Sequence, residues 1–304
     1  MSSAEYQWLE QRCPICELPP TTKLGRRGGA AHRSRAGVEC TIWRCDRCRL
    51  LFPNPMPVPA GGLGQHYAID ADEYFVHHEI KTRDEQAYVL LGEAESLIHS
   101  RGHLLDVGCG RGELLRAARD RGWSATGIEL SSTFADYAEK HSQAEILRVP
   151  LAECAFPSQS FDVVILQAVL EHLYAPDAVI REISRILRPG GVLYTDVPNE
   201  EGLYARLGNM YQMLRGRDWV INLSPTFSPF HVFGFGRRSL GALLKKHHLQ
   251  PEIWHIGGGA CRLSRRAGVL ARAEAVAAAA IAGFSNAIRM GTYLAVWSRK
   301  EAYA

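Results

Sequence analysis

The feature that most constrains the fold is a glycine-rich turn between two short apolar runs. The first run, His103–Val107, is followed by glycines at alternate positions, Gly108, Gly110 and Gly112, and the second run ends at Glu129. Glycine allows a sharp backbone turn and carries no Cβ that would keep a ligand away from the strand ends. A carboxylate at the end of the next strand can accept hydrogen bonds from two ribose hydroxyls. The pattern therefore predicts an α/β sheet with a nucleoside site.

The spacing of these glycines is G-x-G-x-G. A fold that binds the pyrophosphate of a dinucleotide typically has G-x-G-x-x-G, whose third glycine lets the helix N-terminus approach a phosphate. A nucleoside ligand without a diphosphate does not need that third glycine. The spacing therefore favours S-adenosylmethionine (SAM) and disfavours a nicotinamide-dependent oxidoreductase.

The rest of the chain continues the alternation of β-type runs with helices, which predicts a doubly wound, mostly parallel α/β sheet. The expected strands are seven, at 103–107, 125–129, 146–149, 161–167, 192–197, 252–256 and 293–298. The expected helices are at 82–100, 113–121, 132–141, 176–187 and 239–247, with an Ala-rich helix between the last two strands.

Four of the eight cysteines form two C-x-x-C pairs, Cys13 with Cys16 and Cys45 with Cys48. Two such pairs close in sequence predict one tetrahedral zinc site, because each tight turn can direct two thiolates at a single ion. The chain would then begin with a small zinc ribbon. Four thiolates fill the coordination of zinc and leave no position for substrate, so we expect a structural zinc. Free thiols or a redox pair are the alternative, and Cys40 and His32 are substitute ligands to consider.

Two segments of the N-terminal part are expected to be irregular. The stretch between the cysteine pairs, KLGRRGGAAHRSRAGVE at 23–39, is rich in Gly and Arg, and PNPMPVPAGGLG at 53–64 is rich in Pro and Gly. Such composition marks loops and linkers. The expected organisation is a zinc-ribbon module with its linker at 1–60, a helical lid segment at 61–100, and the sheet domain at 101–304 with a lid insertion at about 199–236.

The charge and hydropathy of the chain restrict its surroundings. No uncharged apolar stretch of about 18 residues is present, and the first residues do not read as a secretory signal, so we expect a cytoplasmic protein without a membrane span. The net charge is only +3, but residues 23–49 carry eight basic and two acidic side chains. Nucleic acid therefore stays open as a partner, although a small molecule is favoured. The oligomeric state is not determined by the sequence.

Four motifs carry a resemblance to a known family. They are LLDVGCGRGELL at 104–115, GIELS at 127–131, FDVVILQAVLEHLYAP at 161–176 and LRPGGVLYTDVPN at 187–199. Over about residues 100–300 the chain resembles class I SAM-dependent methyltransferases. Its front end, with CPIC and WRCDRCRLLFPNPMP, resembles a bacterial subgroup that has an N-terminal zinc ribbon. The resemblance implies a Rossmann-like methyltransferase sheet.

The resemblance also implies the cofactor contacts. The side chain of Asp106 and the backbone at Gly108, Gly110 and Gly112 would hold the methionine part of SAM, and Glu129 would hold its ribose. Other expected contacts lie further along the chain. The family's usual Asp near position 150 is absent, so the adenine would meet Leu130 and the backbone at Leu151 and Ala152, or Glu153, while Gln167 would lie near the sulfonium.

Two histidines are candidate proton acceptors for a hydroxyl nucleophile, because a neutral imidazole accepts protons near pH 7. His172 follows the fourth strand at its carboxyl end, and His231 lies in an aromatic stretch that could close over a substrate. The alternative is that each ring serves only as a hydrogen-bonded packing group. Tyr67, Tyr74 and Tyr204 are further candidates to face a substrate.

The predicted function is methyl transfer from SAM (EC 2.1.1.-) to a small molecule such as a sugar, a polysaccharide precursor or a secondary metabolite, at oxygen. One alternative is an RNA methyltransferase that docks through the basic zinc ribbon. Another is a zinc-ribbon binding protein without activity.

Overall fold

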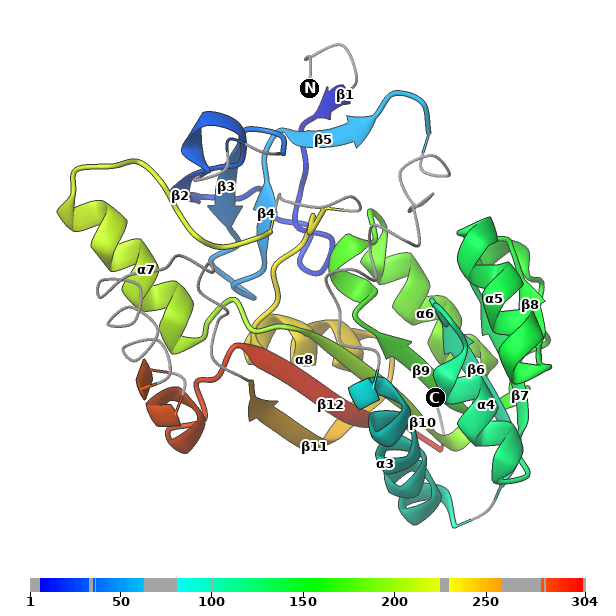
Figure 1. The fold of residues 1–304 in the computed structure, drawn as a ribbon. Coiled ribbons are helices and arrows are strands. Elements are labelled where there is room, and N and C mark those ends of the chain that lie inside the picture. The colour runs from blue at the N-terminus through cyan, green and yellow to red at the C-terminus, as the bar shows by residue number, and fades with distance from the viewer. Residues whose placement is uncertain are drawn as a thin grey trace.

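The computed structural model describes residues 6–32, 35, 37–62, 81–99, 101–224, 230–258, 280, 281 and 283–302. Within these residues, seven strands form one sheet in the order β11-β12-β10-β9-β6-β7-β8 (Figure 1). Only β12 runs against the others in this sheet. The strands are β6 (His103–Val107), β7 (Ser124–Ile128), β8 (Glu145–Leu147), β9 (Phe161–Gln167), β10 (Leu187–Pro198), β11 (Leu249–Gly257) and β12 (Tyr293–Lys300).

Helices cover both faces of this sheet. Side chains alternate between the two faces along each strand, and both faces carry apolar side chains that the helices bury. Leu104, Val163 and Ile165 share a core with α3 and α4 on one face. Their neighbours Leu105 and Val164 share a core with α6 and α8 on the other face. The helices are α3 (Lys81–Ile98), α4 (Glu113–Asp120), α5 (Ser132–Ser142), α6 (Pro176–Ile186), α7 (Leu203–Leu214) and α8 (Arg237–Lys246). The expected elements are thus present, with ends that differ by a few residues, and most of the Ala-rich stretch lies outside the described residues.

The N-terminal segment, residues 6–62, contains more strands than we expected. Its strands are β1 (Tyr6–Leu9), β2 (Thr22–Arg27), β3 (Cys40–Arg44), β4 (Leu51–Pro53) and β5 (Met56–Pro59). The expectation that 53–64 would form no sheet was wrong, because β5 pairs with β1 in a two-stranded sheet. Proline is tolerated in an edge strand, where its missing N–H has no ladder partner to lose.

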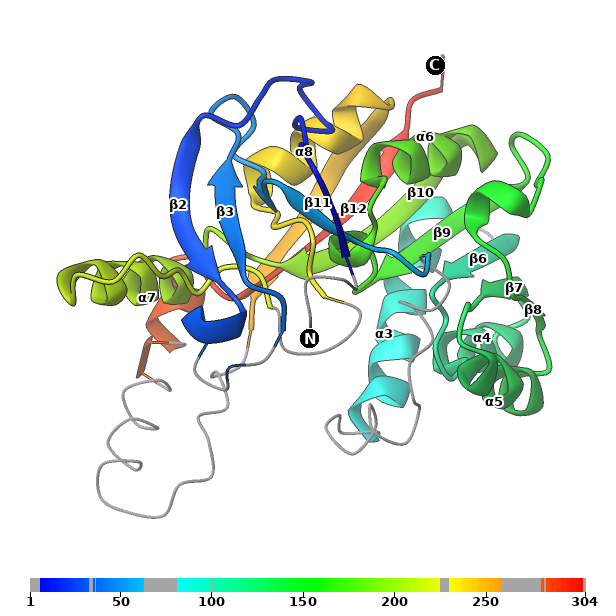
Figure 2. The ribbon, with the colours of Figure 1, turned by 90° about the horizontal axis from the view of Figure 1, so that it is seen from above.

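The expectation that 23–39 would not pack was also wrong. β2 pairs with β3, and the turn η2 (Gly29–Ala31) follows β2 in the chain. The outer edge of β2 meets a distant part of the chain: the Arg26 N–H donates to the Asp218 carbonyl at 2.9 Å, and the Val220 N–H donates to the Arg26 carbonyl at 3.0 Å. Figures 1 and 2 show β2 and β3 lying beside the segment around α7. These contacts order a segment whose composition alone predicts a loop.

The N-terminal segment and the sheet domain share one hydrophobic core. Cys13, Cys45 and Phe52 belong to the same buried cluster as Leu243 and Leu294. Backbone bonds join the two parts, because the amides of Leu51 and Gly234 each donate to the other's carbonyl at 3.0 and 2.8 Å. The part of the chain that the structure describes has no helix long and apolar enough to cross a membrane.

Candidate functional site

The glycine turn joins β6 to α4 at the carboxyl edge of the sheet. The amides of Gly108 and Cys109 donate to the Ile128 carbonyl at 2.8 and 3.0 Å, which fixes the turn against the end of β7. Gly110 has φ +54° and no atom within 4 Å of where a Cβ would stand. This glycine therefore borders open space at the edge where ligands of such sheets bind.

Glu129 follows β7 and lies against the turn. One carboxylate oxygen accepts the Gly110 N–H at 2.9 Å and the other accepts the Ser131 N–H at 2.8 Å. The Leu130 amide is a third backbone donor to this carboxylate, whose two oxygens can accept about four hydrogen bonds in total. Burial raises the pKa of Glu129, while the amides of Ser131 and Gly110 oppose that shift. The carboxylate is thus held in place beside the open side of Gly110.

The other expected cofactor residues surround the same edge. Asp106 ends β6 in a buried position, where burial, followed by the charges of Glu113 and Glu129, raises its pKa to about 8. Gln167 is exposed at the end of β9, and Leu130 is half-buried next to Glu129. The turn η3 (Leu151–Glu153) places Leu151 in the core, while Ala152 is exposed.

The structure brings the two histidines together. Their ring centroids lie 4.9 Å apart at an interplanar angle of 75°. His172 belongs to the turn η4 (Leu170–His172) after β9, and the amides of Val232 and Phe233 donate to the Glu171 carbonyl at 2.8 and 3.1 Å. These two bonds hold the segment of His231 on η4.

The protonation of this group follows from its contacts. The Nδ1 of His172 lies 3.1 Å from the Phe230 carbonyl, which can only accept, so Nδ1 carries the proton and Nε2 is the basic nitrogen of the neutral ring. Burial lowers the pKa of His231 to about 3. Glu171, which the sequence analysis did not single out, lies with Oε1 3.9 Å from His172 Nε2. Burial raises its pKa to about 8, and its Oε2 has no hydrogen-bond partner among the described residues.

Comparison with known proteins agrees with this geometry. Residues 105–195 match the family model described as "Methyltransferase domain". Residues 105–195 are thus similar to class I SAM-dependent methyltransferases.

Curated relatives match part of this chain. A ubiquinone biosynthesis O-methyltransferase of Coxiella burnetii is 29% identical over 128 residues, which cover 40% of this chain and 53% of that protein. A protein of the same name from Pseudomonas fluorescens is 36% identical over 121 residues, which cover 36% and 51%. The chain thus spans about half the length of the curated relatives it matches.

A solved structure shares the fold. The crystal structure of a SAM-dependent methyltransferase from Archaeoglobus fulgidus matches with a TM-score of 0.52 at 18% identity, over 75% of this chain and 99% of that one. At this level of identity the likeness establishes a Rossmann-like methyltransferase fold.

A small cavity separates the histidine pair of the methyltransferase domain from the N-terminal segment. It measures about 30 Å³ and is lined by Arg27 and Cys40 from the N-terminal segment and by Tyr174 and His231 from the sheet domain. Arg27 donates from Nε to the Leu223 carbonyl at 2.9 Å. Such a volume holds about one water molecule.

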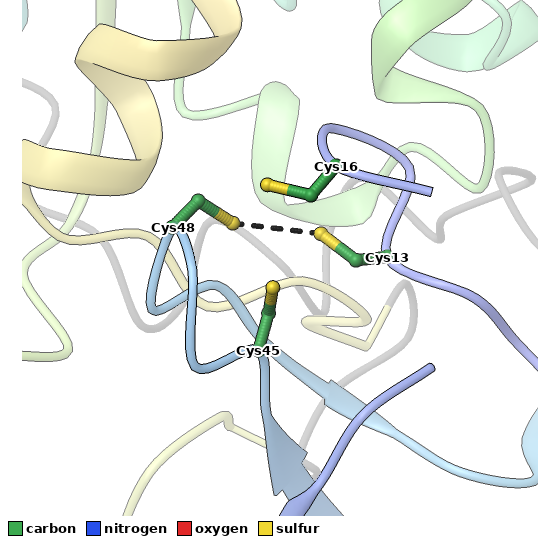
Figure 3. A group of neighbouring side chains, drawn as sticks. All are labelled: Cys13, Cys16, Cys45 and Cys48. Atoms are coloured by element: carbon green, nitrogen blue, oxygen red, sulfur yellow. Dashed lines mark hydrogen bonds between the residues drawn. The ribbon is translucent and has the colours of Figure 1, made fainter. Parts of the chain in front are cut away.

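The four predicted metal ligands converge. The sulfur atoms of Cys13, Cys16, Cys45 and Cys48 all lie within 4.8 Å of one another and point toward one centre (Figure 3). The two turns that carry them have the same backbone bonds. In the first, the Glu17 amide donates to the Cys13 carbonyl at 2.7 Å, and in the second the Arg49 amide donates to the Cys45 carbonyl at 2.7 Å.

Other expected residues fall elsewhere. Cys40 is not a member of the sulfur cluster, and its thiol donates to the Val38 carbonyl. Tyr204 is partly exposed on α7. Tyr67 and Tyr74 lie outside the described residues, together with the rest of 63–80 in the expected lid segment at 61–100. Glu171 could have been noticed in the sequence only through its position next to His172.

Proposed function

We propose that this protein transfers a methyl group from SAM to an oxygen of a small-molecule acceptor, such as a sugar, a polysaccharide precursor or a secondary metabolite. The observation that carries the proposal is the pairing of the open glycine turn with the Glu129 carboxylate inside a methyltransferase domain. The names of the relatives, which act in ubiquinone biosynthesis, support a small acceptor methylated at oxygen.

The residues at the sheet edge fit the cofactor. In this proposal the backbone at Gly108, Gly110 and Gly112 and the Asp106 carboxyl hold the methionine part, and Glu129 holds the ribose through its remaining lone pairs. The adenine would lie by Leu130, Leu151 and Ala152, with Gln167 near the sulfonium. When bound, SAM supplies an electrophilic methyl group on a positively charged sulfur. The residues contribute mainly by holding the acceptor oxygen in line with that group.

His172 is the proposed proton acceptor. Its Nδ1 proton is committed to the Phe230 carbonyl, so Nε2 is oriented as the basic nitrogen. His231 is a weaker base because burial lowers its pKa to about 3. We therefore assign His231 a positioning role: its ring packs edge-on against His172. The Glu171 carboxyl beside them, whose pKa burial raises to about 8, is mostly protonated at pH 7, so it contributes packing around His172 rather than a negative charge.

The N-terminal segment supports a small acceptor over RNA. Two of its basic side chains pair with acidic residues of the segment 199–236: Lys23 pairs with Asp218 at 3.1 Å, and Arg49 pairs with Glu201 at 2.6 Å.

The cysteine cluster fits a structural zinc. Tetrahedral zinc with Zn–S bonds near 2.3 Å holds its sulfur atoms about 3.8 Å apart, and the Sγ atoms of Cys13 and Cys48 lie 3.4 Å apart. Four thiolates would hold the ion and join the two turns. We propose that zinc stabilises the N-terminal segment and takes no part in methyl transfer.

Calorimetric titration with S-adenosylhomocysteine (SAH) tests the proposal. We expect the zinc-loaded protein to bind SAH and not NADH, and Glu129→Ala to weaken SAH binding by at least about tenfold. Glu145→Ala is the matched control, because it removes an exposed carboxylate at the first residue of β8, at the end of the strand away from the cofactor edge. No SAH binding by the folded protein would favour a zinc-ribbon binding protein without activity.

A further inference from the structure

A second cavity lies at the edge of the sheet opposite to the glycine turn. It measures about 310 Å³ and is bordered by Gln159 before β9, by Arg181 and Ser184 of α6, by His248 before β11, and by Lys300 at the end of β12. Strand β9 begins beside this cavity and ends at Gln167 on the cofactor edge. Figure 2 shows β12 ending beside α6 and α8. The cavity is therefore separate from the methyl-transfer site.

Lys300 is the unusual residue of this cavity. It is only 6% exposed, and its ammonium donates to the Leu187 carbonyl at 2.8 Å. Among the residues that the structure describes, no carboxylate lies within 4.0 Å of this ammonium. An ammonium has three protons, so two donors remain beside the cavity. A buried charge without a counterion is costly unless a ligand compensates it.

Other groups of the cavity wall can also donate. Arg181 is exposed and lines the cavity, and its charge interacts with that of Glu182. Arg185 keeps its positive charge in the wall, although Glu182, Ser158 and the Phe156 carbonyl already accept from its guanidinium. Ser184 adds a hydroxyl.

The acidic residues near this cavity are paired with basic neighbours. Glu182 pairs with Arg185, Asp177 with His247 and Lys246, and Glu301 with His248. None of these carboxylates is among the residues that line the cavity. The cavity surface thus combines positive charge with hydrogen-bond donors.

We propose that this cavity binds a small phosphate-type anion, either inorganic phosphate or the phosphate group of a small metabolite. The ammonium of Lys300 and the guanidinium of Arg181 are the principal contacts, and Ser184 donates a further hydrogen bond. Phosphate is the fitting class because its several oxygens accept from separate donors at once. The competing explanation is that Lys300 only caps the carboxyl end of α6, where cations are favoured.

The test compares Lys300→Met with Lys245→Met in the full-length, zinc-loaded protein. Both variants lose one positive charge in neighbouring parts of the fold, but Lys245 is exposed on α8 and does not line the cavity. The probes are inorganic phosphate and glycerol 3-phosphate, measured by calorimetry at constant ionic strength with chloride as the background. Stronger binding of the ester would identify a phosphorylated metabolite as the source, and stronger binding of the free ion would identify phosphate itself.

We expect the parent protein and Lys245→Met to bind a probe alike, and Lys300→Met to bind it at least about tenfold more weakly. Arg181→Met provides a second test if Lys300→Met does not fold, because Arg181 is exposed and its loss leaves the core intact. It is expected to weaken binding in the same direction. The proposal is overturned if the parent binds neither probe. It is also overturned if Lys300→Met lowers thermal stability but binds the probe with the same affinity as the parent.

Discussion

Replacing Gly110 by alanine tests whether the glycine turn faces the cofactor. The added methyl would meet no protein atom within 4 Å, so it would not clash inside the fold. It would stand in the open space beside the Glu129 carboxylate, which accepts the Gly110 N–H at 2.9 Å. If SAM lies across this turn, the methyl group separates the backbone from the ligand.

The expected magnitudes differ for stability and for binding. An L-residue in the left-handed region costs about 1–2 kcal/mol, and Gly110 has φ +54°. For a protein of this size that loss lowers the melting temperature by about 2–4 °C. We expect SAH affinity to fall by more than this strain explains, by at least about tenfold, or ~1.4 kcal/mol.

Gly122→Ala is the matched control. Gly122 has φ +81° and also has nothing within 4 Å of its Cβ position, but it follows α4 at the other end of that helix. Thermal unfolding should show a similar decrease in melting temperature for both variants. Calorimetry should show weaker SAH binding for Gly110→Ala alone. Equal SAH affinities in the two variants would refute the placement of the cofactor against this turn.

Three other perturbations test separate parts of the structure. His172→Gln should lower turnover at least about a hundredfold while SAH affinity stays within about twofold, since a positioned base contributes that much to rate; parent-like turnover would remove His172 from the mechanism. Cys45→Ser should release zinc and lower the temperature of a single unfolding transition, because Cys45 belongs to the core shared with the sheet domain; a separate early transition with an unchanged main one would instead show an independent module. His231 is half-buried, and desolvation lowers its pKa to about 3, whereas the unfolded chain takes up its proton near pH 6.5. The folded state therefore loses stability as pH falls below about 6.5. In urea unfolding, this residue should make the parent's free energy of unfolding about 2 kcal/mol lower at pH 5 than at pH 7. His231→Phe should not show this loss.

Some of the site could be predicted from sequence because its parts are local. The glycines, Glu129 and the end of β6 lie within 30 positions and follow from strand and turn patterns. The two C-x-x-C turns are also local, so each pair of thiols could be recognised by itself. The prediction from composition that the segments of β2 and β5 are irregular was wrong. These strands are ordered by partners distant in sequence, such as Val220 for β2 and the strand β1 for β5.

The sequence by itself determined the alternating elements, the glycine turn and the types of side chain available for chemistry. The periodicity of apolar residues and the conformational needs of glycine act over a few positions, so they are legible without a structure. The tertiary structure decided which distant groups meet: His231 beside His172, the Glu171 carboxyl next to them, and the two thiol pairs around one centre. It also placed the Lys300 side chain at a cavity whose lining contains no carboxylate among the described residues. These contacts depend on how the sheet, the helices and the N-terminal segment pack together. Burial and the electrostatic surroundings of a side chain are set by that packing and not by the local sequence pattern.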